Sequence, residues 1–153
     1  MTVDSLPDEY YMQMAIELAR EAMDQGEVPV GAVVVRQGEV IARARNEKEA
    51  TGDPTDHAEM LAIRRAVQRT GSWRLTDAAM FVTLEPCPMC AGAMVQARLG
   101  RLVFGTYDSK GGAVGSLIDI LDLPGSIHRV AVKSGILKEE CGELLSSFFE
   151  KRR

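Results

Sequence analysis

The chain has 153 residues, 46% of them hydrophobic, three cysteines and a formal net charge of −4. These values predict a single domain over residues 1–153 with a core of its own, and they exclude a disordered chain, a small disulfide-stapled protein and nucleic-acid binding by bulk charge. No hydrophobic run approaches the ~20 residues that span a bilayer, and the first five residues lack a secretion signal, so we expect a cytoplasmic protein without a membrane span.

The first half of the chain carries helical and strand patterns in turn. Ser5 to Asp8 resemble a capping box, and apolar residues then recur at three-and-four spacing, which predicts an amphipathic helix. A Gln37-Gly38 turn between two β-branched runs predicts an antiparallel hairpin. In order, we expect a helix ending near Gly26, strands at 30–35 and 39–44, a polar loop over 46–56 and a helix over 57–68.

The second half alternates short apolar runs with amphipathic segments. Its predicted elements are a strand at 79–84, a helix at 87–97, a strand at 102–105, a Gly-rich loop at 105–115, a short helix at 116–121, a strand at 129–133 and a closing helix at 137–152. The run at 102–105 is apolar throughout, as expected of a buried parallel strand. Helices alternating with strands after an initial hairpin predict a three-layer α/β/α domain around a mixed five-stranded sheet.

Two short motifs carry the chemistry. Cys87 and Cys90, three residues apart on the first turn of a helix, lie on one face, where helix-terminal N–H groups favour the thiolate that metals require. His57 supplies a third ligand type. The other histidine, His128, is not placed in a ligand pair, and Cys141 falls on the apolar stripe of the last helix, which predicts a buried hydrophobic side chain. Three protein ligands leave an open position for water, which is typical of catalytic zinc.

Glu59 follows His57 by two residues, close enough to reach a zinc-activated water. A carboxylate at that point can accept the proton of the water and later deliver it to a leaving group. A lone Cys-x-x-Cys or a lone His-x-Glu is weak evidence, but the two motifs together match the known signature of zinc-dependent nucleobase deaminases. We therefore predict a zinc-dependent hydrolase with one Zn²⁺ per subunit.

Longer segments carry a family resemblance. Residues 57–60 and 83–94 resemble the bacterial tRNA-specific adenosine deaminases of the cytidine deaminase-like superfamily, and residues 28–33, 103–105, 115–117 and 135–149 are similar to them too. The resemblance implies a cytidine deaminase-like fold and hydrolytic deamination of the wobble adenosine in a tRNA anticodon loop to inosine. It also implies an anticodon stem-loop as partner and a homodimer.

The same resemblance assigns roles to individual residues. It implies that His57, Cys87 and Cys90 hold the zinc and that Glu59 is the proton shuttle. For substrate binding it implies the residues Val28, Asn46, Ala58, Leu84, Asp108, Lys110, Phe148, Phe149, Arg152 and Arg153. Two alternatives stay open: Asn46 as a turn-forming residue that closes a strand, and the two phenylalanines as core. Asp56 and Tyr107 depart from the family pattern, the first by placing a carboxylate beside a metal ligand.

Two other functions compete with this interpretation. The first is deamination of a free base or nucleoside such as guanine, cytosine or cytidine. Such an enzyme has no use for an aromatic pair followed by the basic residues 151–153. The second is a zinc-stabilised RNA-binding or scaffold protein, which the presence of Glu59 disfavours because a structural site needs no proton shuttle. A deaminase of riboflavin synthesis is disfavoured because its two cysteines are more widely spaced.

Overall fold

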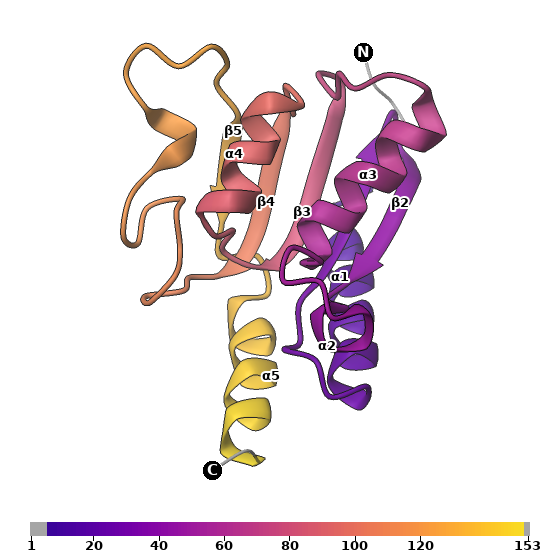
Figure 1. Cartoon of the computed structure of the whole chain (residues 1–153), viewed down its shortest axis with the longest axis vertical. Coiled ribbons are helices and arrows are strands. Elements are labelled where there is room, and N and C mark those ends of the chain that lie inside the picture. The colour runs from indigo at the N-terminus through magenta and orange to yellow at the C-terminus, as the bar shows by residue number, and fades with distance from the viewer. Residues whose placement is uncertain (1–5, 152–153) are drawn as a thin grey trace.

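The computed structural model describes residues 6–151. Its centre is a sheet of five strands in the order β2-β1-β3-β4-β5 (Figure 1). The strands are β1 (Gly31–Arg36), β2 (Glu39–Arg45), β3 (Ala78–Leu84), β4 (Arg101–Thr106) and β5 (Ala131–Ser134). β1 is antiparallel to both β2 and β3, whereas β3, β4 and β5 are parallel to one another. The predicted mixed sheet, its hairpin and its buried parallel strand are confirmed.

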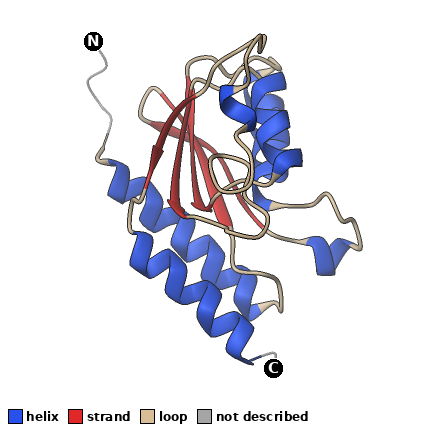
Figure 2. Cartoon of the chain, turned by 90° about the vertical axis from the view of Figure 1, so that its left-hand side faces the viewer, coloured by secondary structure: helices blue, strands red, loops and turns tan. Residues whose placement is uncertain are grey.

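Helices cover both faces of the sheet, which confirms the predicted three-layer α/β/α architecture (Figure 2). The long helices α1 (Asp8–Asp24) and α5 (Lys138–Lys151) pack side by side on one face. The opposite face carries α3 (Ala58–Thr70) and α4 (Pro88–Gln96), which lie in front of the sheet in Figure 1. In the part of the chain that the structure describes, no helix is both long and apolar enough to cross a membrane.

Side chains point alternately to the two faces of the sheet along each strand, and this divides the core in two. Val33 and Val35 of β1 pack with the apolar stripe of α1, whereas Val34 between them packs toward α3 and α4. Successive side chains of a strand point to opposite faces, so a strand buried on both faces is apolar at nearly every position. In β3, Phe81 packs in the cluster with α1, and Val82 packs in the cluster with α3 and α4. The continuous apolar runs thus follow from the central position of these strands.

Three local expectations are wrong. Residues 116–121 do not form a helix: the backbone turns back so that Val114 pairs with Asp119, and only the short 3-10 helix η1 (Ile120–Asp122) follows. The backbone N–H of Ile120, which a helix over these residues would pair with the carbonyl of Ser116, donates instead to the carbonyl of Ala113 at 2.8 Å. The loop at 46–56 contains one helical turn, α2 (Lys48–Thr51). α1 begins after Pro7 without a side-chain cap, and Ser5, the start of the expected capping box, lies outside the described residues.

Candidate metal centre

Three side chains from two helix starts meet at one point. The Nδ1 atom of His57 lies 3.6 Å from Sγ of Cys87 and 3.5 Å from Sγ of Cys90. All the potential ligand atoms of these residues lie within 4.8 Å of one another. Spacing of this order allows a single ion to contact all three atoms, and one imidazole with two thiols is a donor set that suits zinc. The three residues that the sequence predicts as ligands are thus brought together, 30 and 33 residues apart along the chain.

The local backbone explains this convergence. His57 and Cys87 both stand immediately before a helix, in extended conformation, at the N-cap positions of α3 and α4. Pro88 occupies the first turn of α4, where its fixed φ and missing N–H are tolerated. α3 and α4 lie on the same face of the sheet (Figure 1). Their N-terminal ends therefore place the imidazole and the two thiols against each other.

Electrostatics favour one thiolate in this group. Hydrogen bonding from the Cys90 thiol, reinforced by His57, outweighs burial and lowers the pKa of Cys87 to about 4. The same contact with Cys87, together with burial, raises the pKa of Cys90. Hydrogen bonding to Cys87 raises the pKa of His57. The largest influence on Cys87 is therefore the neighbouring thiol, rather than the helix N-terminus alone that the sequence pattern indicates.

Glu59 lies on the first turn of α3 beside the three ligands and is only 4% exposed. Burial, the largest influence, raises the pKa of its carboxyl group to about 7. Such a carboxyl group can bind and release a proton near neutral pH, which is what a general acid and base requires. The residue borders a small cavity next to His57 and Cys87. Its side chain is thus placed to act on a molecule in that cavity.

Asn46 connects this helix start to the preceding strand. Its Oδ1 accepts a hydrogen bond of 2.8 Å from the backbone N–H of Ala58, and its Nδ2 donates one of 3.1 Å to the carbonyl of Val28. The residue also borders the small cavity, so both roles considered for it, closing a strand and facing a substrate, are compatible with its place. Ala58 itself is fully buried, and its N–H is taken by Asn46.

The small cavity has a volume of about 150 Å³. It brings together four of the predicted substrate-binding residues, two of the predicted metal ligands and the predicted proton shuttle; these residues are Val28, Asn46, Leu84, Asp108, His57, Cys87 and Glu59. Val28, Val30 and Leu84 give the lining an apolar part, and the other lining residues carry polar or ionisable groups, a combination that can orient a ligand. Lys48 and Glu85 also line it, and sequence reasoning missed both.

A second depression, which we call the outer groove, adjoins the small cavity through Val28, Leu84 and Asp108. It measures about 600 Å³, and the predicted residues Lys110 and Phe149 lie along it. Phe149 is 52% exposed, whereas Phe148 next to it is 6% exposed, so the two phenylalanines have different environments. Arg152 and Arg153 lie outside the described residues.

The two departures from the family pattern have clear environments. The carboxylate of Asp56 faces away from the ligands, with Oδ1 accepting from Arg64 at 3.0 Å and Oδ2 from the hydroxyl of Thr51 at 2.8 Å. It is therefore neutralised by a partner of its own. Tyr107 lies on the outer groove, half exposed, with its hydroxyl 2.9 Å from that of Ser134.

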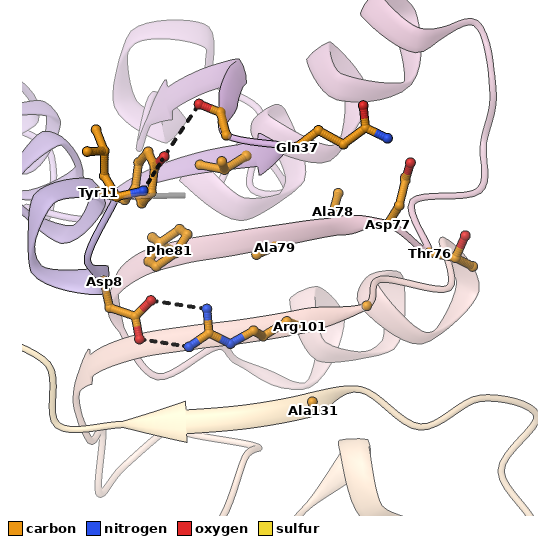
Figure 3. A pocket seen from close by; sticks show the side chains of 14 residues that line it. Asp8, Tyr11, Gln37, Thr76, Asp77, Ala78, Ala79, Phe81, Arg101 and Ala131 are labelled. Carbon is orange, nitrogen blue, oxygen red and sulfur yellow. Dashed lines mark hydrogen bonds and ion pairs between the residues drawn. The ribbon is translucent and has the colours of Figure 1, made fainter. Parts of the chain in front are cut away.

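A larger cavity, about 620 Å³, lies at the other end of the parallel strands (Figure 3). It is bordered by Ala79 at the start of β3 and Arg101 at the start of β4, whereas the ligand group follows the end of β3. The guanidinium of Arg101 donates to both carboxylate oxygens of Asp8, at 3.1 and 2.7 Å (Figure 3). Among the described residues, the one group of His, Cys or acidic side chains that could hold a metal ion is His57, Cys87 and Cys90, beside the small cavity. We therefore take the small cavity, and not this larger one, as the candidate site.

Comparison with known proteins agrees with this geometry. The family model of the MafB19-like deaminases matches residues 7–153. The chain is 51% identical to the tRNA-specific adenosine deaminase of Bacillus subtilis over 146 residues, which are 95% of this chain and 91% of that protein. It is 46% identical to the tRNA-specific adenosine deaminase of Aquifex aeolicus, with 95% of each chain covered.

Solved structures extend the comparison. One from a study of A-to-I editing by tRNA:A34 deaminases superposes with a TM-score of 0.86 at 44% identity, covering 89% of this chain and 99% of that one. The guanine deaminase of Bacillus subtilis superposes with a TM-score of 0.67 at 31% identity, covering 96% and 94%. Identity of 51% over nearly the whole chain decides the assignment. This chain therefore belongs to the family of the tRNA-specific adenosine deaminases.

Proposed function

We propose that this protein hydrolyses the wobble adenosine of a tRNA anticodon loop to inosine. The observation that carries the proposal is the convergence of His57, Cys87 and Cys90 with the buried Glu59 on one small cavity. The choice of adenosine in tRNA is supported by the relatives of 46–51% identity, which are tRNA-specific adenosine deaminases.

The donor set fits one zinc ion. His57, Cys87 and Cys90 would hold it, and when bound it supplies a Lewis acid that activates water at neutral pH. A carboxyl group with a pKa near neutrality can act first as a base and then as an acid. The carboxylate of Glu59 therefore accepts the proton of the attacking water. It passes this proton to N1 of the purine, and it then carries the second proton of the water from the new C6 hydroxyl to the amino nitrogen. The C6–O bond forms, the C6–N6 bond breaks, and ammonia leaves.

The remaining groups orient the base. Val28 and Leu84 form apolar sides for a flat ring, and Asn46 offers its amide at the edge of the cavity. An adenosine reaches such a cavity only when it is turned out of its stack, which costs least in a loop. The outer groove, with Lys110 and the exposed ring of Phe149, lies where the neighbouring nucleotides would run. We also assign phosphate contacts to Arg152 and Arg153, which lie outside the described residues.

We also propose a homodimer in the cytoplasm, the compartment of tRNA modification. Helix α4 is rich in small residues, and a side chain at Gly92 would meet no atom within 4 Å, so a second subunit has room to approach there. Light scattering at micromolar concentration tests this: twice the chain mass of 16.7 kDa is expected, and a monomer mass contradicts it.

The test of function is the choice of substrate. Purified protein is incubated with an anticodon stem-loop, free adenosine, cytidine or guanine, and the ammonia released is measured. Ammonia from the stem-loop, with inosine in the RNA, is expected. Release from guanine alone would instead favour the free-base alternative, to which the 31% identical guanine deaminase gives some support.

The matched variant for this assay is Glu59→Gln, which keeps the size of the side chain but cannot carry the proton. We expect it to retain zinc and to lose turnover by about 10²–10⁴-fold. A variant with a near-normal rate would show that Glu59 is not the proton shuttle.

A further inference from the structure

Glu85, directly after β3, is a carboxylate in an almost closed environment, 2% exposed. Its Oε1 accepts hydrogen bonds from the backbone N–H of Asp108 at 2.9 Å and from the hydroxyl of Ser116. Its Oε2 accepts from the backbone N–H groups of Val114 at 2.9 Å and of Ser116 at 3.0 Å. Four donors therefore occupy the two oxygens, which leaves this carboxylate no free oxygen for a substrate proton.

These donors come from the two ends of one loop. Asp108 lies at its start, and Val114 and Ser116 at its end, so Glu85 closes the segment 108–116. Within the loop, Oδ1 of Asp108 accepts from the N–H groups of Lys110 at 3.0 Å and Gly111 at 3.1 Å. The loop has no regular structure of its own, so its shape depends on these contacts with a residue 23 to 31 positions earlier.

Gly112 shows how closely the loop is fitted to the carboxylate. A Cβ atom added to it would lie 2.2 Å from Cδ of Glu85 and 2.3 Å from Oε1. Contacts this short are not tolerated, so any larger residue at 112 must displace the carboxylate or the loop. The backbone passes over Glu85 because position 112 has no side chain.

The start of this loop forms one side of the outer groove. Residues 107–111, which we call the groove wall, line it together with Val28 and Leu84. Asp108 of the wall also borders the small cavity, so the wall continues from the reacting base outward. Its place relative to β3 is set by the carboxylate that follows that strand.

We propose that Glu85 is a positioning residue for the deamination: it holds the groove wall where the RNA beside the target adenosine must lie, without touching the reacting atoms. The inference rests on the proposed function. Glu85 has to remain a carboxylate, because an amide would turn its own N–H groups toward donors.

The experiment compares Glu85→Gln with the wild type in steady-state deamination of the anticodon stem-loop. Positioning of the RNA predicts a KM raised about tenfold with kcat within about threefold, because binding contacts are lost while the proton shuttle is kept. Zinc content and melting temperature are measured on the same preparations. An unchanged KM, or a loss confined to kcat, would overturn the inference.

Two further variants keep the test decisive if Glu85→Gln does not fold. Gly112→Ala keeps the glutamate at position 85 but adds a methyl group that must displace its carboxylate or the loop. This variant should reproduce the rise in KM. Ser116→Ala removes one donor of the four and should raise KM by a smaller factor, about two- to threefold. Folded variants with the KM of the wild type contradict the inference. A wild type that does not deaminate the stem-loop contradicts the proposed function instead.

Discussion

The Oδ1 atom of Asn46 accepts a hydrogen bond of 2.8 Å from the backbone N–H of Ala58, twelve residues later in the chain. Ala58 is the first residue of α3, and its N–H has no partner within the helix. The bond thus anchors the end of α3 that carries Glu59 and follows His57. A residue expected to face the substrate also stabilises the helix start on which the chemistry depends.

Replacing Asn46 separates these contributions. Asn46→Ala loses the acceptor for Ala58 and the donor to Val28, so the free energy of unfolding should fall by about 1–2 kcal/mol and turnover at least tenfold. Asn46→Asp keeps the acceptor and should recover part of the stability. Urea denaturation and stem-loop assays measure both. Equal stability of the alanine variant and the wild type would show that the bond contributes nothing.

The three cysteines offer a matched pair for the metal centre. Cys87 is one of the three potential ligands, whereas Cys141 is a residue of α5 that is 1% exposed and points into the core. Cys87→Ala should bind almost no zinc and be inactive, because two remaining ligands hold the ion poorly. Cys141→Ala should keep about one zinc per chain with a modest loss of stability. The zinc content of both variants is measured by metal analysis of protein purified without chelator. Zinc retained by Cys87→Ala would refute the ligand assignment.

The adjacent phenylalanines should respond in opposite ways. Phe148 is 6% exposed, so Phe148→Ala should lower the free energy of unfolding by about 3 kcal/mol through lost packing. Phe149 is 52% exposed on the outer groove, so Phe149→Ala should leave stability nearly unchanged and weaken stem-loop binding about tenfold through lost stacking on a base. Denaturation and fluorescence-anisotropy titrations test this. Unaltered binding by Phe149→Ala would remove that ring from the RNA contacts.

The ion pair at the far end of the sheet predicts a pH dependence of stability. Hydrogen bonding to Arg101, reinforced by Lys133, lowers the pKa of Asp8 below its ordinary value of 3.8. Because the pKa is depressed in the folded state, the contribution of Asp8 to stability is complete above the unfolded value of 3.8. It is lost as pH falls from that value through the lower folded pKa. The difference in unfolding free energy between wild type and Asp8→Asn should therefore be constant near neutrality and shrink below about pH 4.

A surface pair is the control for that measurement. Glu17 pairs with Arg20 one turn along α1, and both side chains are about half exposed or more. Glu17→Gln should change stability little at any pH, because solvent screens exposed pairs. A similar pH profile of stability for both variants would contradict a pH-dependent contribution from the contact between Asp8 and Arg101.

Much of the fold follows from local pattern. The four long helices α1, α3, α4 and α5, the hairpin turn at Gln37-Gly38 and the buried parallel strand β4 were predicted because amphipathic spacing and turn residues act over a few positions. The candidate metal ligands were predicted for the same reason: Cys87 and Cys90 are one helical turn apart, and each motif opens a helix.

The tertiary structure alone decided how distant segments meet. No local pattern shows that the carboxylate of Glu85 takes the N–H groups of Val114 and Ser116, or that the N–H of Ile120 donates to Ala113 rather than to Ser116, as a helix over 116–121 would require. The order β2-β1-β3-β4-β5 and the place of Val28 beside Leu84 and Asp108 depend likewise on packing between segments far apart in the chain. Spacing along the chain determines which residues share a helix face, whereas the bonds that shape an irregular loop are formed only when its distant partner is in place.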